Sequence, residues 1–336
     1  MKSKRLDPLR AGTFAVALLV VTPFTSRADV EDAITRTFEV DPGGQLVVEL
    51  DRGSIEVKSA DAASVEVDIT RKAGGSQAKA EKTLKDHEVT VAQTGNKVEI
   101  KAEYKGQKAK GWFSRSPELQ VKCRITVPRR FDVDLKTAGG GIEVAELGGK
   151  VQAHTSGGNM TFGKIEGPVS AHTSGGSITV RTAKGKVDVN TSGGNLSLAD
   201  IEGDLTAQTS GGSIHVEKLT GQSVVKTSGG HIEVADLKGK IDARTSGGSI
   251  AAKFLEQPAG DCTFKTSGGN VTIILSEKIA VDVDAHTSAG RVSTDFPVTA
   301  VIQGEQKKNQ IRGKINGGGP LITAHTSGGS VRLQKQ

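Results

Sequence analysis

The chain has 336 residues, of which 43 are Gly and only 3% are aromatic, and its formal net charge is +6 at pH 7. Residues 1–28 hold five Lys and Arg and one Asp, so removing them lowers this charge to +2. The nearly neutral remainder argues against a nucleic-acid-binding protein. Frequent glycines with few aromatics predict recurring turns around a core of small aliphatic side chains.

Residues 1–28 have the pattern of a secretory signal peptide. Basic residues precede an apolar stretch over residues 11–24, and Ser26, Arg27 and Ala28 follow it. This order predicts export, with cleavage before Asp29. The apolar stretch is shorter than the ~20 residues that a membrane-spanning helix needs, so we expect no integral membrane span after cleavage. The expected location is the periplasm, the cell surface or the extracellular space.

Residues 29–135 form a β-rich N-terminal region. Apolar and polar residues alternate over residues 45–50, 64–69 and 97–100, which is typical of half-buried strands. One short helix is expected over residues 76–86, which are rich in Ala, Lys, Glu and Gln. Residues 51–57 resemble a diverged copy of the turn that recurs later in the chain.

A basic segment within this region surrounds Trp112 and Phe113. Two interpretations are open. The segment is either a contact loop for an acidic glycan or a lipid head group, or a solvated loop whose aromatic side chains pack against the domain.

Residues 136–336 are organised by a repeated Thr-Ser-Gly-Gly motif. The spacing of the motif is constant from Thr137 to Thr245 and wider after that, which we interpret as loop insertions in the last coils. The motif or a one-residue variant of it begins at Thr137, Thr155, Thr173, Thr191, Thr209, Thr227, Thr245, Thr266, Thr287 and Thr326. Each unit has one alternating run before the motif and one after it, which predicts two strands per unit.

Alignment of the units places apolar residues in columns. One column begins Ile142, Met160 and Ile178, and another runs from Leu147 to Leu255. Stacked units would bury these columns between two sheets. The predicted fold is therefore all-β, a β-solenoid of 18-residue two-strand repeats similar to a parallel β-helix. An antiparallel meander, with each Ser-Gly-Gly as a hairpin turn, is the alternative. The glycines are predicted to supply positive φ at the corners.

These residues carry a resemblance to a known family. The segment 119–128 leads into Thr137-Ala138-Gly139-Gly140-Gly141-Ile142-Glu143-Val144 and then into recurrent Gly-Gly-x-Ile-x-Val units. This arrangement is similar to the bacterial putative-adhesin family, a group of β-strand-repeat domains of unknown function. The resemblance covers nearly the whole chain after residue 28. It implies the architecture and supplies no catalytic motif.

Candidate contact residues precede each motif threonine. If the threonines face the core, the preceding residues face outward and form a ladder that could contact a sugar or a protein. The proposed surface-contact ladder is His154, His172, Asn190, Gln208, Lys226 and Arg244, and the same column begins at Lys136 and ends with Lys265, His286 and His325. Adjacent His154 and His172 could also share a metal ion, but a solvated polar ladder is the preferred interpretation.

The sequence contains no recognisable catalytic motif, and we assign no catalytic residue, cofactor or metal. Cys123 and Cys262 could form a disulfide in an oxidising compartment or lie as buried thiols. The predicted function is an exported, non-catalytic adhesin or structural module of the cell envelope, with an envelope protein or glycan as partner and no nucleic acid. The alternatives are a polysaccharide-binding or polysaccharide-modifying protein and a periplasmic accessory of a signalling system.

Overall fold

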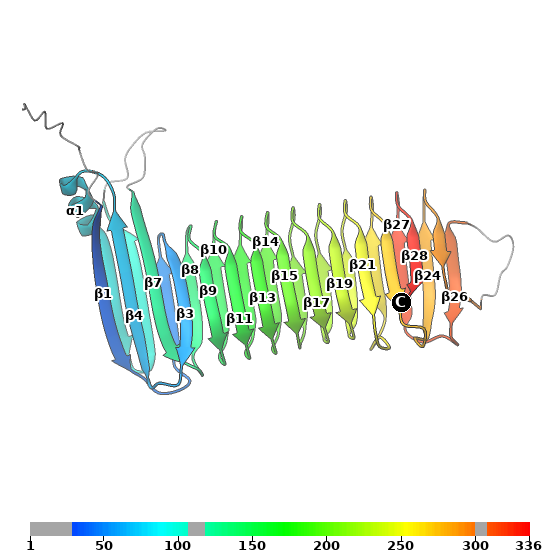
Figure 1. The fold of residues 1–336 in the computed structure, drawn as a ribbon, viewed down its shortest axis with the longest axis horizontal. Helices are drawn as coiled ribbons and strands as arrows, with labels where there is room; N and C mark the ends of the chain where they lie inside the picture. Colours follow the sequence, from blue (N-terminus) through cyan, green and yellow to red (C-terminus); the bar gives the residue numbers. More distant parts are fainter. Residues whose placement is uncertain (1–28, 107–117, 300–307) are drawn as a thin grey trace, which may run out of the picture.

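The computed structural model describes residues 29–106, 118–299 and 308–336. The predicted signal peptide, residues 1–28, lies outside this part of the chain. The described residues form 28 strands and the helix α1 (Gln77–Asp86), one residue shorter than predicted. The strands make two sheets that extend along an elongated body (Figure 1).

Each sheet contains 14 strands in the described part of the chain. In spatial order, sheet A consists of β1 (Val30–Glu39), β4 (Ser64–Ala73), β7 (Leu119–Pro128), β3 (Ser54–Ala60), β9 (Ile142–Leu147), β11 (Met160–Ile165), β13 (Ile178–Ala183), β15 (Leu196–Ile201), β17 (Ile214–Leu219), β19 (Ile232–Leu237), β21 (Ile250–Phe254), β23 (Val271–Leu275), β28 (Val331–Lys335) and β25 (Val292–Thr294). From the same end, sheet B consists of β5 (His87–Thr94), β6 (Lys97–Tyr104), β2 (Gln45–Leu50), β8 (Asp132–Thr137), β10 (Val151–Thr155), β12 (Val169–Thr173), β14 (Val187–Thr191), β16 (Leu205–Gln208), β18 (Gln222–Lys226), β20 (Lys240–Arg244), β22 (Cys262–Thr266), β27 (Leu321–Thr326), β24 (Val281–Thr287) and β26 (Gln310–Ile315).

Successive units pair in parallel, which confirms the solenoid and makes the meander alternative wrong. In sheet B, Val151 pairs with Val169 and Thr155 with Thr173. In sheet A, Met160 pairs with Ile178 in the same way. Each unit thus contributes one strand to each sheet, and equivalent residues of neighbouring coils stack at the strand spacing of ~4.8 Å.

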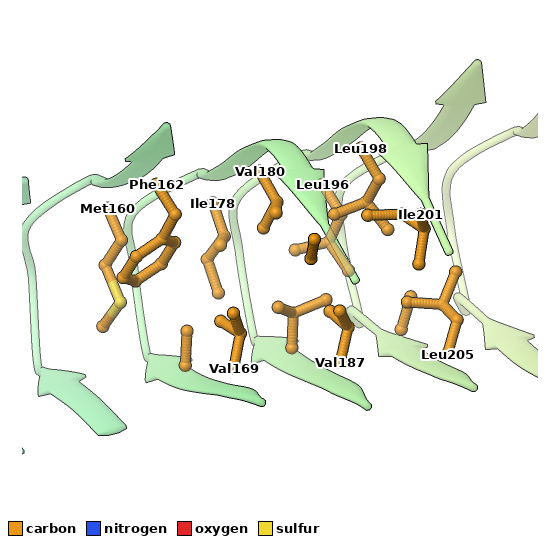
Figure 2. Close-up of a cluster of buried hydrophobic side chains, with 14 of the residues drawn as sticks. Met160, Phe162, Val169, Ile178, Val180, Val187, Leu196, Leu198, Ile201 and Leu205 are labelled. Atoms are coloured by element: carbon orange, nitrogen blue, oxygen red, sulfur yellow. The ribbon is translucent and has the colours of Figure 1, made fainter. Parts of the chain in front are cut away.

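The core lies between the two sheets and consists of the predicted aliphatic columns. Figure 2 shows Ile178, Leu196 and Leu198 of sheet A facing Val187 and its neighbours of sheet B. These side chains are at most 1% exposed. Because each strand alternates, its other side chains face solvent, as binary patterning requires.

The predicted core position of Leu255 is wrong, since this side chain is 38% exposed. In the regular coils two successive residues face outward before the last core position, as in β13 before Ala183. Strand β21 instead alternates strictly to its end, so Phe254 takes the inward position. Its ring packs edge-to-face on Phe264 with the centroids 6.2 Å apart.

The Ser-Gly-Gly corners use glycine for close approach and not for positive φ. Positive φ occurs at none of the motif glycines in the described residues, although it occurs at Gly53. A Cβ on Gly212 would lie 1.9 Å from the carbonyl oxygen of Gly194 in the preceding coil. The hydroxyl of Thr209 donates to the same carbonyl at 2.9 Å. Glycine is needed here because a side chain would displace the carbonyl that the threonine binds.

The buried threonines hold both their own corner and the neighbouring coil. Besides its bond to the preceding coil, Thr209 accepts a hydrogen bond from the backbone N–H of Gly212 at 3.3 Å. Thr155, Thr173, Thr191 and Thr227 repeat both bonds. The threonines therefore face inward, as the predicted contact ladder requires, and each hydroxyl is satisfied although it is buried.

Both ends of the rod are built out of chain order. Strands β2 and β3 pair with β8 and β9, so residues 51–57 form a true corner, with Gly53 accepting the hydrogen bond of Thr137. Strands β6 and β7 then stack outside this coil. At the other end, β27 and β28 insert between the coil of Thr266 and that of Thr287. The spacing from Thr245 to Thr266 holds a longer connection between β21 and β22, as predicted, whereas the spacing from Thr287 to Thr326 also holds an additional strand, β26.

Antiparallel strands close both sheets at the first end of the rod and sheet B at the other end. Strand β1 pairs with β4 and β4 with β7 at one end of sheet A, and β5 pairs with β6 in sheet B. At the other end β26 pairs with β24. At the first end these strands and α1 (Figure 1) replace the parallel edge that a further coil could extend, whereas sheet A ends at the other end in the short parallel strand β25. Both sheets contain strands from before and after residue 135. The predicted division into residues 29–135 and 136–336 therefore rests on the sequence pattern and stays a prediction.

Cys123 and Cys262 are free, buried thiols that lie on β7 and β22, towards opposite ends of the rod. Burial raises the pKa of Cys123 to about 12, and it also raises the pKa of Cys262. Both side chains therefore act as small apolar core residues and are poor nucleophiles.

Candidate functional site

The predicted contact ladder is a single column on the outer face of sheet B. The strand registers align His154 with His172, His172 with Asn190, Asn190 with Gln208, Gln208 with Lys226, and Lys226 with Arg244. Each of these residues follows a buried core residue and precedes the buried motif threonine, so alternation directs it outward. Whether the column contacts a ligand stays a prediction.

A groove of about 570 Å³ runs along part of this column. Its lining comes from the ends of the sheet B strands and from the motif serines that follow them, which are here called its rim. The lining residues are Asn190, Thr191, Gln208, Thr209, Ser210, Lys226, Thr227, Ser228, Arg244, Thr245, Ser246, Lys265, Thr266, Ser267, His325 and Ser327. The structure thus brings four of the six predicted ladder residues into one groove, together with Lys265 and His325.

The lining is polar and positively charged. It includes Lys226, Arg244 and Lys265 but no Asp or Glu among the described residues. Arg244 Nε lies 2.7 Å from Asp242 Oδ1, on the side of the strand away from the corner. No ion pair involves Lys226 or Lys265 within the described part of the chain. The groove can therefore offer several N–H and O–H donors to an acceptor-rich ligand.

His325 closes the groove at the C-terminal end of the rod. Its ring stacks on that of His286 from the neighbouring strand, with centroids 4.0 Å apart. Burial lowers the pKa of His325, and the nearby His286 and Lys265 lower it further. The imidazole of His325 is thus held in its neutral form more strongly than a free histidine.

His154 and His172 lie beside each other but outside the groove lining. The Nε2 atom of His172 is 3.2 Å from Ser170 Oγ, so a neighbouring hydroxyl already engages this ring. Among the residues that the structure describes, no group of three or more His, Cys, Asp or Glu side chains is placed to hold a metal ion. The two histidines form the polar continuation of the ladder.

Trp112 and Phe113, the predicted contact loop, lie outside the described residues. The chain around them connects β6 to β7, which form the coil next to the first end of the rod. The outer face of sheet A holds a second hollow of about 320 Å³, lined by residues of β1, β3, β4 and β7. There Glu56 lies 2.8 Å from the Lys58 ammonium, and this hydrogen-bonded contact lowers the pKa of the carboxyl. Glu56 thus pairs with a basic side chain of the same lining.

Sequence reasoning missed a second ladder, at the residue after each Ser-Gly-Gly. Asn195 Oδ1 accepts a hydrogen bond from the backbone N–H of Ser213 at 2.8 Å, and Ser213 Oγ accepts from that of His231 at 3.1 Å. The series continues with His231 Nδ1, which accepts from Ser249. The available signal was the column itself, since each of these side chains can accept a hydrogen bond.

A buried ionic cluster at the N-terminal end was also missed. The guanidinium of Arg71 is 2.5 Å from Asp32 Oδ2 and also donates to the carbonyl oxygens of Leu84 and His87. The His87 ring is fully buried, and its Nε2 lies 3.4 Å from Asp51 Oδ1. The cluster therefore ties β1, β4, α1 and β5 together and has a structural role.

The sequence of the chain matches a known protein family. Residues 44–334 match the model of the Toastrack DUF4097 family. The chain belongs to this family. The resemblance inferred from the sequence is confirmed by this match, which covers most of the chain. A comparison with curated proteins found no match.

Similar solved structures span nearly the whole described rod. A putative adhesin from Bacteroides fragilis is 12% identical with a TM-score of 0.35, and the match covers 91% of this chain and 97% of that one. A putative lipid binding protein from Parabacteroides distasonis is 13% identical with a TM-score of 0.40 and the same coverage. These likenesses carry no functional argument. In the described part of this chain no helix has the length and apolar character of a membrane span.

Proposed function

We propose that the protein is an exported, non-catalytic module of the cell envelope that binds an extended ligand along the groove on sheet B. The observation that carries this proposal is the groove itself, a continuous polar surface that crosses neighbouring coils at a fixed spacing. A rigid repetitive surface can contact equivalent units of a long ligand without an ordering cost in the protein.

A binding role is favoured over an enzymatic one by the chemistry of the lining. Polysaccharide hydrolysis commonly uses two carboxyl groups on either side of the scissile bond. The described lining offers hydroxyl, amide, ammonium, guanidinium and imidazole groups and no carboxyl. The motif threonines beneath the groove are occupied in structural hydrogen bonds, as Thr209 illustrates.

The binding proposal is tested by obstructing the groove without changing its charge. Ser228→Trp with Ser246→Trp places bulky side chains on its rim, whereas Ser156→Trp with Ser174→Trp makes the same change at equivalent exposed corners outside the lining. Retention of the purified protein on isolated cell envelopes is measured for both. We expect loss of retention for the first pair only. Equal retention of both variants would contradict the groove as the binding surface.

Export is the second component of the proposal, supported by residues 1–28 of the sequence. Protease is added to intact producing cells, with a known periplasmic protein as control. Digestion of the protein while the control is spared would support display at the surface, as expected for an adhesin. Protection until the outer membrane is breached would favour a periplasmic structural role, and fractionation with cytosolic markers would contradict export.

A further inference from the structure

Five basic side chains follow one another along the outer face of sheet B. The registers align Lys226 with Arg244, Arg244 with Lys265, Lys265 with His325, and His325 with His286. They come from five adjacent strands, β18, β20, β22, β27 and β24. Because β27 inserts out of chain order, Lys265 and His325 are distant in sequence and neighbours in space. The row exists only in the folded rod.

The row has a regular charge spacing. Parallel strands place equivalent residues ~4.8 Å apart, so the charged groups of Lys226, Arg244 and Lys265 are spaced by about one strand each. An extended polymer with an anionic group about every 5 Å would match this spacing. The motif serines along the rim, including Ser228, Ser246 and Ser267, are exposed beside the row. Their hydroxyls add donors and acceptors for a ligand rich in hydroxyl groups.

We propose that the groove binds an acidic polysaccharide, with the carboxylates of its sugar units paired to Lys226, Arg244 and Lys265 of the basic row and with His325 beside them as a hydrogen-bonding neighbour. This inference rests on the proposed binding function and specifies its ligand class. The ammonium groups of Lys226 and Lys265 have no competing ion pair within the described part of the chain. They are therefore available to a ligand carboxylate.

The composition of the lining favours an acidic polysaccharide over two other classes of anionic ligand. Single-stranded nucleic acids are commonly held by aromatic side chains on which the bases stack, and the described lining includes no Phe, Tyr or Trp. An anionic lipid would bring acyl chains that need an apolar surface, and the same lining includes no Leu, Ile, Val, Met or Phe. A polysaccharide that carries both hydroxyl and carboxylate groups matches the positive charge of the lining and its polarity.

The test removes three positive charges from the row and three from another face. In the full chain, Lys226→Gln, Arg244→Gln and Lys265→Gln form the row variant. The control variant is Lys164→Gln, Arg181→Gln and Lys253→Gln, which changes the same residue types on sheet A. Thermal unfolding of both establishes that they are folded. Binding of polygalacturonate, neutral dextran and oligo-dT is then measured by calorimetry at low and at moderate salt concentration.

The proposal expects polygalacturonate to bind the unmodified chain and to bind more weakly at the higher salt concentration. The row variant should lose at least about tenfold in affinity, the cost of about 1.4 kcal/mol, and the control less than twofold. Equal loss in both variants, or tighter binding of oligo-dT than of polygalacturonate, would overturn it. The proposal would also be overturned if dextran binds, if Ser228→Trp with Ser246→Trp abolishes that binding, and if the row variant retains it. That result would leave the groove-binding function intact.

Discussion

The regular coils and the N-terminal end of the rod are stabilised in different ways. In the coils each strand contacts its equivalent in the next unit along the chain, and the same threonine and glycine contacts recur. At the N-terminal end, β1, β4, α1 and β5 are brought together by long-range contacts around Arg71. Apart from the cysteine thiols, Arg71 and His87 are the buried ionisable side chains of the described residues.

The two parts of the rod should therefore be destabilised by different changes. The coils depend on space and on neutral hydrogen bonds, so steric changes should disrupt them and pH should not. The N-terminal end depends on charged groups removed from water, whose protonation has a large energetic effect. A nearest-neighbour array also transmits a local defect only to adjoining coils. The predictions below test each part of this contrast.

The largest effect is expected for Gly212→Ala in the middle of the array. The added methyl would meet the Gly194 carbonyl oxygen at 1.9 Å, so the two coils must separate. We expect a loss of roughly 3 kcal/mol in the free energy of unfolding, as for an overpacked site. Chemical denaturation of the full chain measures this loss.

The adjacent glycine provides the matched control. A Cβ on Gly211 would meet its nearest neighbour at 3.6 Å, which is ordinary contact. Gly211→Ala should change the free energy of unfolding by less than about 1 kcal/mol. Similar losses for both substitutions would show that the corners need glycine for its flexibility and would contradict close approach as the reason.

Thr209→Val should have the next largest effect. The substitution keeps the shape but removes the donor to the Gly194 carbonyl and the acceptor of the Gly212 N–H. Leaving buried polar groups unpaired costs about 1–3 kcal/mol. Thr206→Val is the control, since this side chain faces outward and the next coil already has Val224 at the same place. If the two variants unfold together in urea, the threonine ladder does not stabilise the coils.

How much the sequence could predict depends on the range of the interactions. The core columns, the inward threonines and the helix followed from periodicity and composition within single units. The position of β27 could not be predicted from the sequence. The units of Thr287 and Thr326 have similar motifs, and only the fold decides which of them pairs with the unit of Thr266. Leu255 was assigned to the core because the alignment assumed two successive outward residues near the end of β21, as in the earlier strands of sheet A. Strand β21 alternates to its end instead.

The candidate site shows the same limit. The ladder from His154 to Arg244 could be identified as a column because it recurs once in every repeat unit. The extent of the groove depends on the shape of the folded surface around this column, which the repeat pattern does not encode, and the lining excludes His154 and His172. The cluster of Arg71 and His87 requires the packing of α1 against β4 and β5 and leaves no periodic signal.

The pH dependence of the N-terminal end should differ from that of the coils. Burial lowers the pKa of His87, so the folded protein resists a proton that the unfolded chain accepts below about pH 6.5. The stabilisation by neutral His87 is complete above that pH and is lost as pH falls towards the folded-state pKa. Hydrogen-exchange protection of α1 and β5 should therefore fall between pH 7 and 5 more than that of β15 and β17.

Two substitutions make this comparison specific. His87→Gln should flatten the pH dependence of protection in α1 and β5, because no group there then gains a proton over this range. His215→Gln changes a partly exposed histidine on β17 and should leave that dependence as it was. A uniform loss of protection along the rod, unaltered by His87→Gln, would contradict a separate acid-sensitive end.

The smallest effect is expected for the exposed ladder that follows the corners. Asn195→Ala removes the acceptor of the Ser213 N–H, but water can reach this exposed position and replace it. The free energy of unfolding should fall by only about 0.5–1 kcal/mol. Asn195→Ser should restore most of this loss, because Ser177 and Ser213 accept the same bond in neighbouring coils. A loss as large as that of Thr209→Val would mean that the exposed ladder holds the coils as firmly as the buried one, whereas no loss would leave the threonines and glycines as the contacts that set the spacing of the rod.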